Sequence, residues 1–420
     1  ACPRRDVDDK EQREYSRGAR CTNGELCIKP SFWVDASAGN ITSESVLYRC
    51  VSAKACDASG AAMRCGEGHN VSTVLCGSCV LGENRSDERC ARGYAMQADG
   101  SCQCCASPTV QWLSLLAGLY AMRWVIKTSI RAALSLDGAD ELSRATAAVS
   151  KIGVNYMQTT ALLSGFDLDW GASLRHAFSA MGVAGGAVVQ AVSLQCVFDF
   201  NYASRALVGM IILPLAIALG PGAVLLAEER LRVWWRPRGA APARRRSVRG
   251  RWWASSLVLV WLLYPTVAQE AFRVVRCVQV GKGEWWLRAD LKVKCDGGEY
   301  DAVYALALAA IALFVLGVPL ALLVAMRRRR DAIRASKAGG GTPPDPSARL
   351  YKFLFEPYTP RFFWWETLIM LRKAALVAVL AFVPAEQSAL RVYIGLGVLQ
   401  VPLLLQLTFR PFRTALQNRL

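Results

Sequence analysis

Long apolar runs recur through residues 108–420 and are absent from residues 1–107. The two most regular runs cover residues 362–383 and 389–409 and are joined by the five residues from Pro384 to Ser388. About 20 apolar residues in a helix, rising 1.5 Å each, span the roughly 30 Å hydrocarbon core of a bilayer. The pattern therefore predicts a hairpin of two transmembrane helices.

Five further runs predict transmembrane helices earlier in the chain, at residues 109–126, 146–164, 206–227, 252–272 and 302–326. The span at 206–227 contains Pro214 and Gly220-Pro221-Gly222, so we expect it to bend or break in its lower half. Glycines interrupt the apolar middle of residues 165–202, which we interpret as an outer, re-entrant or interfacial segment rather than a full crossing. The predicted fold is a small disulfide-rich ectodomain, residues 1–107, followed by an all-α polytopic membrane domain, residues 108–420, with about seven transmembrane helices.

Basic residues orient these spans. Nine arginines lie between Arg230 and Arg251, whereas the turn from Pro384 to Ser388 contains no Lys or Arg. Because cytoplasmic loops carry an excess of Lys and Arg, the N-terminal domain is predicted outside and the C-terminus in the cytoplasm. The net charge of +17 arises from clusters placed directly against apolar runs. This placement favours membrane orientation over nucleic-acid binding.

The arginine-rich loop allows two interpretations. Arg244, Arg245 and Arg246 either serve orientation alone or bind anionic lipid headgroups of the cytoplasmic leaflet. In the second case, phosphorylation of Ser247 would weaken the binding.

Residues 1–107 contain twelve of the fifteen cysteines and too few apolar residues for a core of their own. Such a segment is typical of a disulfide framework. Cys277 and Cys295, in the predicted outer loop 273–300, are expected to form a further disulfide. The cysteines predicted in disulfides are Cys2, Cys21, Cys27, Cys50, Cys56, Cys65, Cys76, Cys79, Cys90, Cys102, Cys104, Cys105, Cys277 and Cys295.

The competing interpretation of the cysteines is a zinc site, because Cys76 with Cys79, and the cluster of Cys102, Cys104 and Cys105, have zinc-ligand spacing. Three N-glycosylation sequons argue against it, at Asn40, Asn70 and Asn84. All three share the cysteine-rich segment, which favours an oxidising, extracellular location.

Several polar side chains fall within the predicted spans. Asn155, Gln158 and Thr159 are three and four positions apart and therefore share a helix face. Arg372 and Lys373 lie deep enough in the span at 362–383 that exposure to lipid would be costly. These positions indicate either packed polar contacts and snorkelling or a functional site.

The partners of Arg372 and Lys373 are expected on neighbouring helices. Glu366 lies nearly two turns before Arg372 and is a less favourable partner than a group on another helix. Gln400 and Gln406, in the span at 389–409, are candidates to form hydrogen bonds with such a group.

Two sets of motifs resemble known proteins. The first resembles the EGF- or laminin-like cysteine-rich ectodomain of multi-span surface proteins from algae and protists, in which glycines make the turns between short strands; here it comprises Lys29-Pro30-Ser31-Phe32-Trp33, Arg49-Cys50, Ala55-Cys56, Cys65 and Leu75-Cys76-Gly77-Ser78-Cys79. The second resembles the membrane domain of TRP-like channel proteins of algae and protists; it comprises residues 151–158, Asp169-Trp170, Cys196, Tyr351-Lys352-Phe353-Leu354-Phe355, Phe363-Trp364-Trp365-Glu366, Leu371-Arg372-Lys373, Phe409-Arg410-Pro411-Phe412 and Asn418. This resemblance implies a cation channel or a channel-like sensor subunit.

The turn between the last two spans is too short to hold a selectivity filter. A pore, if present, is expected to be completed by residues beyond Leu420 or by another subunit. The alternative function is a non-conducting membrane anchor or receptor that holds an extracellular assembly through the cysteine-rich domain.

An enzymatic function is not expected. The two histidines, His69 and His176, are not near a recognisable nucleophile or metal cluster, and no nucleotide-binding motif is present. The sequence predicts no cofactor. Expected partners are the lipid bilayer, other subunits and extracellular matrix or surface proteins, in a plasma or ciliary membrane. Because the chain starts at Ala1 without Met, we expect a removed signal peptide or a longer polypeptide.

Overall fold

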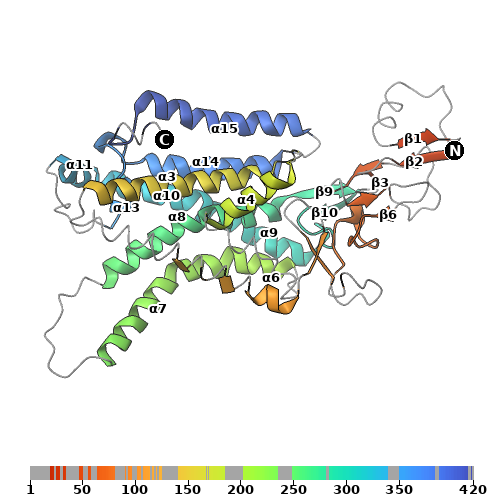
Figure 1. Ribbon diagram of the computed structural model, residues 1–420, viewed down its shortest axis with the longest axis horizontal. Coiled ribbons are helices and arrows are strands. Elements are labelled where there is room, and N and C mark those ends of the chain that lie inside the picture. Colours follow the sequence, from red (N-terminus) through yellow and green to blue (C-terminus); the bar gives the residue numbers. More distant parts are fainter. Residues whose placement is uncertain are drawn as a thin grey trace. The chain divides into compact units, whose positions relative to one another are not determined.

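A computed structural model of the chain is shown in Figure 1. The chain folds into two compact units that do not follow chain order. The cysteine-rich unit comprises residues 1–116, 192–205 and 273–304, and the helical unit comprises residues 117–191, 206–272 and 305–420. The structure describes residues 19–22, 25–28, 32–34, 47–50, 55–57, 64–80, 90, 93–96, 102–105, 107–113, 116–117, 120, 123–124, 141–166, 168, 170–184, 202–234, 248–280, 283–338, 350–383, 387–414 and 418.

The strands of the cysteine-rich unit form short antiparallel pairs. Five two-stranded sheets occur within the described residues: β1 (Ala19–Thr22) with β2 (Glu25–Ile28), β3 (Phe32–Val34) with β4 (Leu47–Arg49), β5 (Cys56–Asp57) with β6 (Arg64–Cys65), β7 (Tyr94–Met96) with β8 (Cys102–Cys104), and β9 (Cys277–Val280) with β10 (Glu284–Leu287). Isolated two-stranded hairpins are marginally stable in water, so this unit needs cross-links.

Disulfides supply those cross-links, which confirms the prediction of disulfide bonds. The described pairs are Cys50–Cys56, Cys65–Cys76, Cys79–Cys102, Cys90–Cys104 and Cys277–Cys295, and Cys105 is also disulfide-bonded. Cys76 and Cys79 thus each pair with a different, distant cysteine and offer no thiolates for zinc. The side chains of Cys2, Cys21 and Cys27 lie outside the described residues.

The hairpin of β9 and β10 packs against the N-terminal part of the cysteine-rich unit. Leu75, in the 3-10 turn η2 (Val74–Cys76), forms one buried cluster with Val280 and Leu291. Gly77 lies so close that a Cβ atom there would overlap Cδ1 of Leu291. A segment from the loop between two predicted spans therefore completes the core of the N-terminal region.

The rest of the described chain is mostly helical. Its elements are α3 (Glu141–Leu163), α4 (Ala172–Ala184), α6 (Tyr202–Leu207), the π-helix η4 (Val208–Ile212), α7 (Leu213–Trp234), α8 (Val248–Val275), α9 (Gly298–Ala310), the π-helix η5 (Ile311–Leu316), α10 (Gly317–Arg328), α11 (Arg330–Ala338), α13 (Lys352–Phe355), the 3-10 turn η6 (Pro360–Phe362), α14 (Trp365–Phe382) and α15 (Ser388–Phe409).

Four helices among the described residues are long and apolar enough to cross a bilayer. They are Tyr202–Glu228, Gly250–Val275, Gly298–Arg328 and Ser388–Phe409, and they match the spans predicted at 206–227, 252–272, 302–326 and 389–409. The spans predicted at 146–164 and 362–383 correspond to the helices α3 and α14, which are not among these four. The span predicted at 109–126 is helical at 108–113, 116–117, 120 and 123–124, and its other residues are not described.

Helices α14 and α15 form a helical hairpin and pack side by side (Figure 1), and of the two only α15 is among the four apolar helices of the described residues. Arg391, near the start of α15, is buried and donates hydrogen bonds to the carbonyl oxygens of Leu380 at 2.8 Å and Val383 at 3.0 Å. These carbonyls lie at the C-terminal end of α14, where they lack partners within their own helix. A cation at this end is also favoured by the helix dipole.

The helix through Gly220-Pro221-Gly222 is continuous, and it changes direction between α6 and the end of α7 (Figure 1). The π-helix η4, several residues earlier, was not predicted. The aromatic stretch before α14 packs into the helical unit. Tyr351, Phe355 and Phe363 are buried in a cluster with residues of α8, α10 and α11, because they fill the space between those helices.

Of the segment 165–202, the structure describes helix α4, which packs against α3. Residues 185–201 lie outside the described residues.

Candidate functional site

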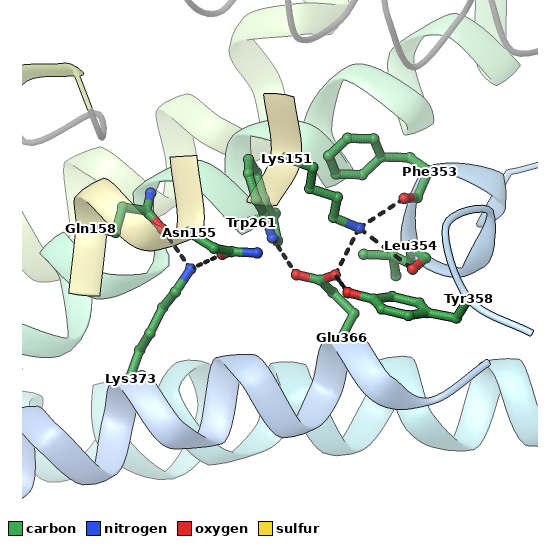
Figure 2. Close-up of polar contacts among 9 residues, drawn as sticks. All are labelled: Lys151, Asn155, Gln158, Trp261, Phe353, Leu354, Tyr358, Glu366 and Lys373. Atoms are coloured by element: carbon green, nitrogen blue, oxygen red, sulfur yellow. Dashed lines mark hydrogen bonds and ion pairs between the residues drawn. The ribbon is translucent and has the colours of Figure 1, made fainter. Parts of the chain in front are cut away.

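A cluster of polar side chains is buried inside the helical unit between α3, α8, α14 and the segment before α14. We call it the buried polar cluster; its members are Lys151, Asn155, Gln158, Trp261, Tyr358, Glu366 and Lys373 (Figure 2). All are at most 6% exposed. Burial of this many polar and charged groups in an apolar bundle is costly unless each is paired.

Helix α3 supplies one row of the cluster. Ala148, Lys151, Asn155, Gln158 and Leu162 are its buried positions and follow the three- and four-residue spacing of one helix face. The predicted polar face of this span thus lies against protein. Its two apolar ends, at Ala148 and Leu162, place the polar side chains in the middle of the contact.

Glu366 of α14 is the anion of the cluster. Nζ of Lys151 lies 2.7 Å from Oε2 of Glu366, and the hydroxyl of Tyr358 donates to the same oxygen at 2.8 Å. Nε1 of Trp261 donates to Oε1 at 2.5 Å. Burial and the adjacent carboxylate both raise the pKa of Tyr358, so its hydroxyl remains a donor. Both carboxylate oxygens are therefore satisfied by protein groups.

Lys151 is held from several sides. Its ammonium also donates to the carbonyl oxygen of Phe353 at 2.9 Å and lies 4.5 Å from the centroid of the Phe353 ring. The backbone before α14 thus contributes acceptors to a charge on α3. This contact ties the aromatic segment to the core of the helical unit.

Lys373 occupies the second half of the cluster, two helical turns beyond Glu366 on the same face of α14. Its ammonium donates to Oδ1 of Asn155 and Oε1 of Gln158, each at 2.5 Å. Nε2 of Gln158 in turn donates to the carbonyl oxygen of Leu262 at 2.9 Å. Figure 2 shows Lys373 pointing from α14 toward the two amides on α3, with Trp261 between them and Glu366. Neutral dipoles, rather than a carboxylate, solvate this lysine.

The structure thus brings four of the predicted intramembrane residues together. Lys373 contacts Asn155 and Gln158, and Arg372 donates from Nη2 to Oγ1 of Thr159 at 3.2 Å. Gln400 is exposed on α15 and Gln406 is partly exposed, and the described contacts do not join either one to Arg372 or Lys373.

Four members of the cluster were not predicted as site residues from the sequence. Glu366 was considered only as a less favourable partner of Arg372. Lys151 extends the row of Asn155 and Gln158 by one turn, and this spacing is the signal that could have identified it. Trp261 and Tyr358 resemble ordinary interfacial aromatics in the sequence, and only the fold shows their donors facing Glu366.

The other predicted site residues are partly described. Asn70 lies in a turn, where its Oδ1 accepts a hydrogen bond from the hydroxyl of Ser72 at 2.7 Å. Asn40, Asn84 and the arginines Arg244, Arg245 and Arg246 lie outside the described residues. Within the described part of the chain, no group of three or more His, Cys, Asp and Glu side chains could hold a metal ion.

Comparison of the chain with protein-family models, with curated proteins and with solved structures finds no match. The resemblances noted in the sequence therefore remain predictions, and the function is inferred from the buried polar cluster and the apolar helices.

Proposed function

We propose that this multi-pass membrane protein is a TRP-like cation channel subunit in which the helical unit acts as a sensor. The buried polar cluster is the observation that carries the proposal. A protein that only anchors an assembly needs apolar helices alone, whereas this bundle encloses Lys151, Glu366 and Lys373. Burying charged residues inside a membrane bundle has a high free-energy cost, and such residues often serve charge sensing or transport.

The same cluster argues against a pore through this site. Lys151 and Lys373 outnumber Glu366, and their positive field would repel a permeating cation. The proposal therefore assigns the cluster to gating and the conduction path to helices elsewhere, including those of another subunit. It places about seven spans in a plasma or ciliary membrane, with the cysteine-rich unit outside, and gives the chain no enzymatic role.

The test is patch-clamp recording of the full chain in cells, with Glu366→Gln and Lys373→Met compared with the wild type. Lys294→Met is the matched control, because Lys294 is an exposed lysine in an ion pair with Glu284. We expect both cluster variants to shift the voltage dependence of the current while the unitary conductance stays unchanged. The control should leave both quantities unchanged.

A second candidate function is the non-conducting anchor or receptor. It is favoured by the cross-linked cysteine-rich unit, in which the β9–β10 hairpin packs on the N-terminal region. Absence of current from surface-delivered wild type, alone and with co-expressed channel subunits, would favour this function over the channel.

A further inference from the structure

Arg372 stands beside the buried polar cluster and has few partners. Its side chain is partly exposed, and Nη2 donates to Oγ1 of Thr159 at 3.2 Å. Its Nε is buried with no hydrogen-bond partner. A guanidinium has five N–H donors and stays charged at any physiological pH. Most of its donors therefore lack a protein acceptor among the described residues.

The local charge balance is also incomplete. Glu366 pairs with Lys151 at 2.7 Å, and no described carboxylate lies within 4.0 Å of a side-chain nitrogen of Arg372 or Lys373. The groups that contact these two cations are an alcohol and two amides, which carry no charge. Glu366 is the described carboxylate that acts on Lys151, Arg372 and Lys373, and it forms an ion pair only with Lys151. Incompletely compensated cations in a low-dielectric environment are unfavourable. The α3–α14 contact therefore carries an excess of positive charge.

We propose that the guanidinium of Arg372 binds a phosphate-type oxyanion at this edge of α3 and α14, with Thr159 beside it. The planar fork of arginine matches the oxygens of a phosphate and forms charge-assisted hydrogen bonds. Lys373, 1% exposed, adds positive potential without touching the ligand.

Two sources can supply this phosphate: a lipid headgroup or a soluble phosphate. Arg372 lies seven residues after Trp365, about 10 Å along the helix axis at 1.5 Å per residue. A long side chain at that depth extends toward the headgroup region, where lipid phosphates lie. The site is independent of conduction, so its test does not depend on the proposed channel function.

The test uses the full chain, delipidated in a maltoside detergent that contains no phosphate. Melting temperature and native mass spectra are recorded with phosphatidylglycerol, with inorganic phosphate, or with diacylglycerol as the uncharged control. Stabilisation and retained lipid with phosphatidylglycerol alone identify a headgroup site, and stabilisation by inorganic phosphate identifies a soluble ligand. The proposal is overturned if neither phosphatidylglycerol nor inorganic phosphate stabilises the protein, or if diacylglycerol stabilises it as much as phosphatidylglycerol does.

Variants assign the effect to Arg372. Arg372→Gln keeps a donor for Thr159 but removes the charge, and we expect it to weaken anion binding about tenfold or more. Arg361→Gln removes an exposed arginine on η6 and should bind as the wild type does. Equal binding by Arg372→Gln and the wild type would refute the assignment.

A second measurement guards against loss of folding. Without added anion, Arg372→Gln should melt at or above the temperature of the wild type, because it removes a cation that forms no ion pair and is only partly compensated by Glu366. A much lower melting temperature, or failure to fold, would show that the protein itself already pairs Arg372, and the proposal would be wrong.

Discussion

Glu366 shows how the helical unit tolerates charge in its interior. Three side chains from different parts of the chain, Lys151, Trp261 and Tyr358, bond its two carboxylate oxygens. Removing one partner of such a pair leaves the other as an uncompensated buried charge. Replacing Lys151 or Glu366 alone should therefore destabilise the protein, although the ion pair as a whole adds little net stability.

We expect Glu366→Leu to lower the free energy of unfolding by about 3–5 kcal/mol, because Lys151 loses its counter-charge. The double variant Lys151→Met with Glu366→Leu should recover most of this loss, since it removes both charges. Thermal or denaturant unfolding in detergent micelles measures the difference. Glu284→Gln, which breaks the exposed pair with Lys294, should cost less than about 1 kcal/mol. The prediction would be contradicted if the double variant lost as much free energy of unfolding as Glu366→Leu and Lys151→Met lose when their separate losses are added.

His69 predicts a pH dependence in the cysteine-rich unit. Burial lowers its pKa below 6.5, partly opposed by the hydrogen bond between Nδ1 and the carbonyl oxygen of Cys76. The unfolded chain therefore binds more protons at mildly acidic pH, so stability is present above pH 6.5 and is lost as the pH falls. Hydrogen exchange of residues 64–80, corrected for intrinsic rates, should show less protection at about pH 5.5 than at about pH 7.5. His69→Gln should flatten this dependence; an unchanged profile in that variant would assign it to another group.

At the scale of single residues, the sequence predicted the polar side chains better than their partners. Asn155, Gln158, Arg372 and Lys373 were identifiable because a polar residue in an apolar run needs compensation. Their pairing depends on contacts between positions more than 200 residues apart, such as that of Lys373 with Asn155. Helical periodicity predicts which residues share a face of a helix, but it does not predict which other helix packs against that face.

The helices themselves were largely predictable, and their irregularities were not. Pro214 and Gly220-Pro221-Gly222 indicated a bend or break, and the helix is continuous there, but nothing in the sequence indicated the π-helix η4 that begins at Val208. A second π-helix, η5, interrupts the helix of the fifth span, where the hydroxyl of Tyr264 donates to the carbonyl oxygen of Val315 at 2.7 Å. Such segments depend on side chains from neighbouring helices, which a single apolar run does not reveal.

Contact between η2 and the β9–β10 loop gives a prediction at the scale of elements. A methyl group at Gly77 would overlap the Leu291 side chain, so Gly77→Ala should destabilise this contact by about 1–3 kcal/mol. Adding Leu291→Ala should restore much of the loss because it frees the required volume. Hydrogen exchange of residues 277–295 measures the effect. Gly298→Ala is the control, since no atom lies within 4 Å of the position that its methyl group would take. Failure of the second substitution to restore protection would rule out overlap as the cause.

For the whole molecule, charge and hydropathy predicted a membrane protein with disulfides, and four helices and several disulfides agree. The composite nature of the cysteine-rich unit was not predicted. The outer loop 273–300 was expected to hold a disulfide, but nothing in its sequence indicates that Val280 and Leu291 pack on Leu75. Apolar residues in a short loop show no helical or strand periodicity, so the sequence does not indicate which residues they pack against.

The predicted orientation can be tested with two exposed positions, Gln387 in the α14–α15 turn and Ala335 in α11. A membrane-impermeant maleimide applied to intact cells should label Gln387→Cys above the wild-type background. Ala335→Cys should be labelled only after permeabilisation, because the arginines before it favour the cytoplasm. The reverse pattern would invert the topology, and labelling of both in intact cells would contradict the predicted arrangement of spans.

The composite core of the cysteine-rich unit also has a consequence for synthesis. Leu75 leaves the ribosome more than 200 residues before Leu291, its partner in the same buried cluster. At roughly 5–20 residues per second, the N-terminal segment waits about 10–40 s for the rest of its core. During that interval its cysteines are open to oxidation while Leu75 is still uncovered. The order of disulfide formation is therefore set in part by translation, and assistance from a chaperone or a disulfide isomerase would act in this interval.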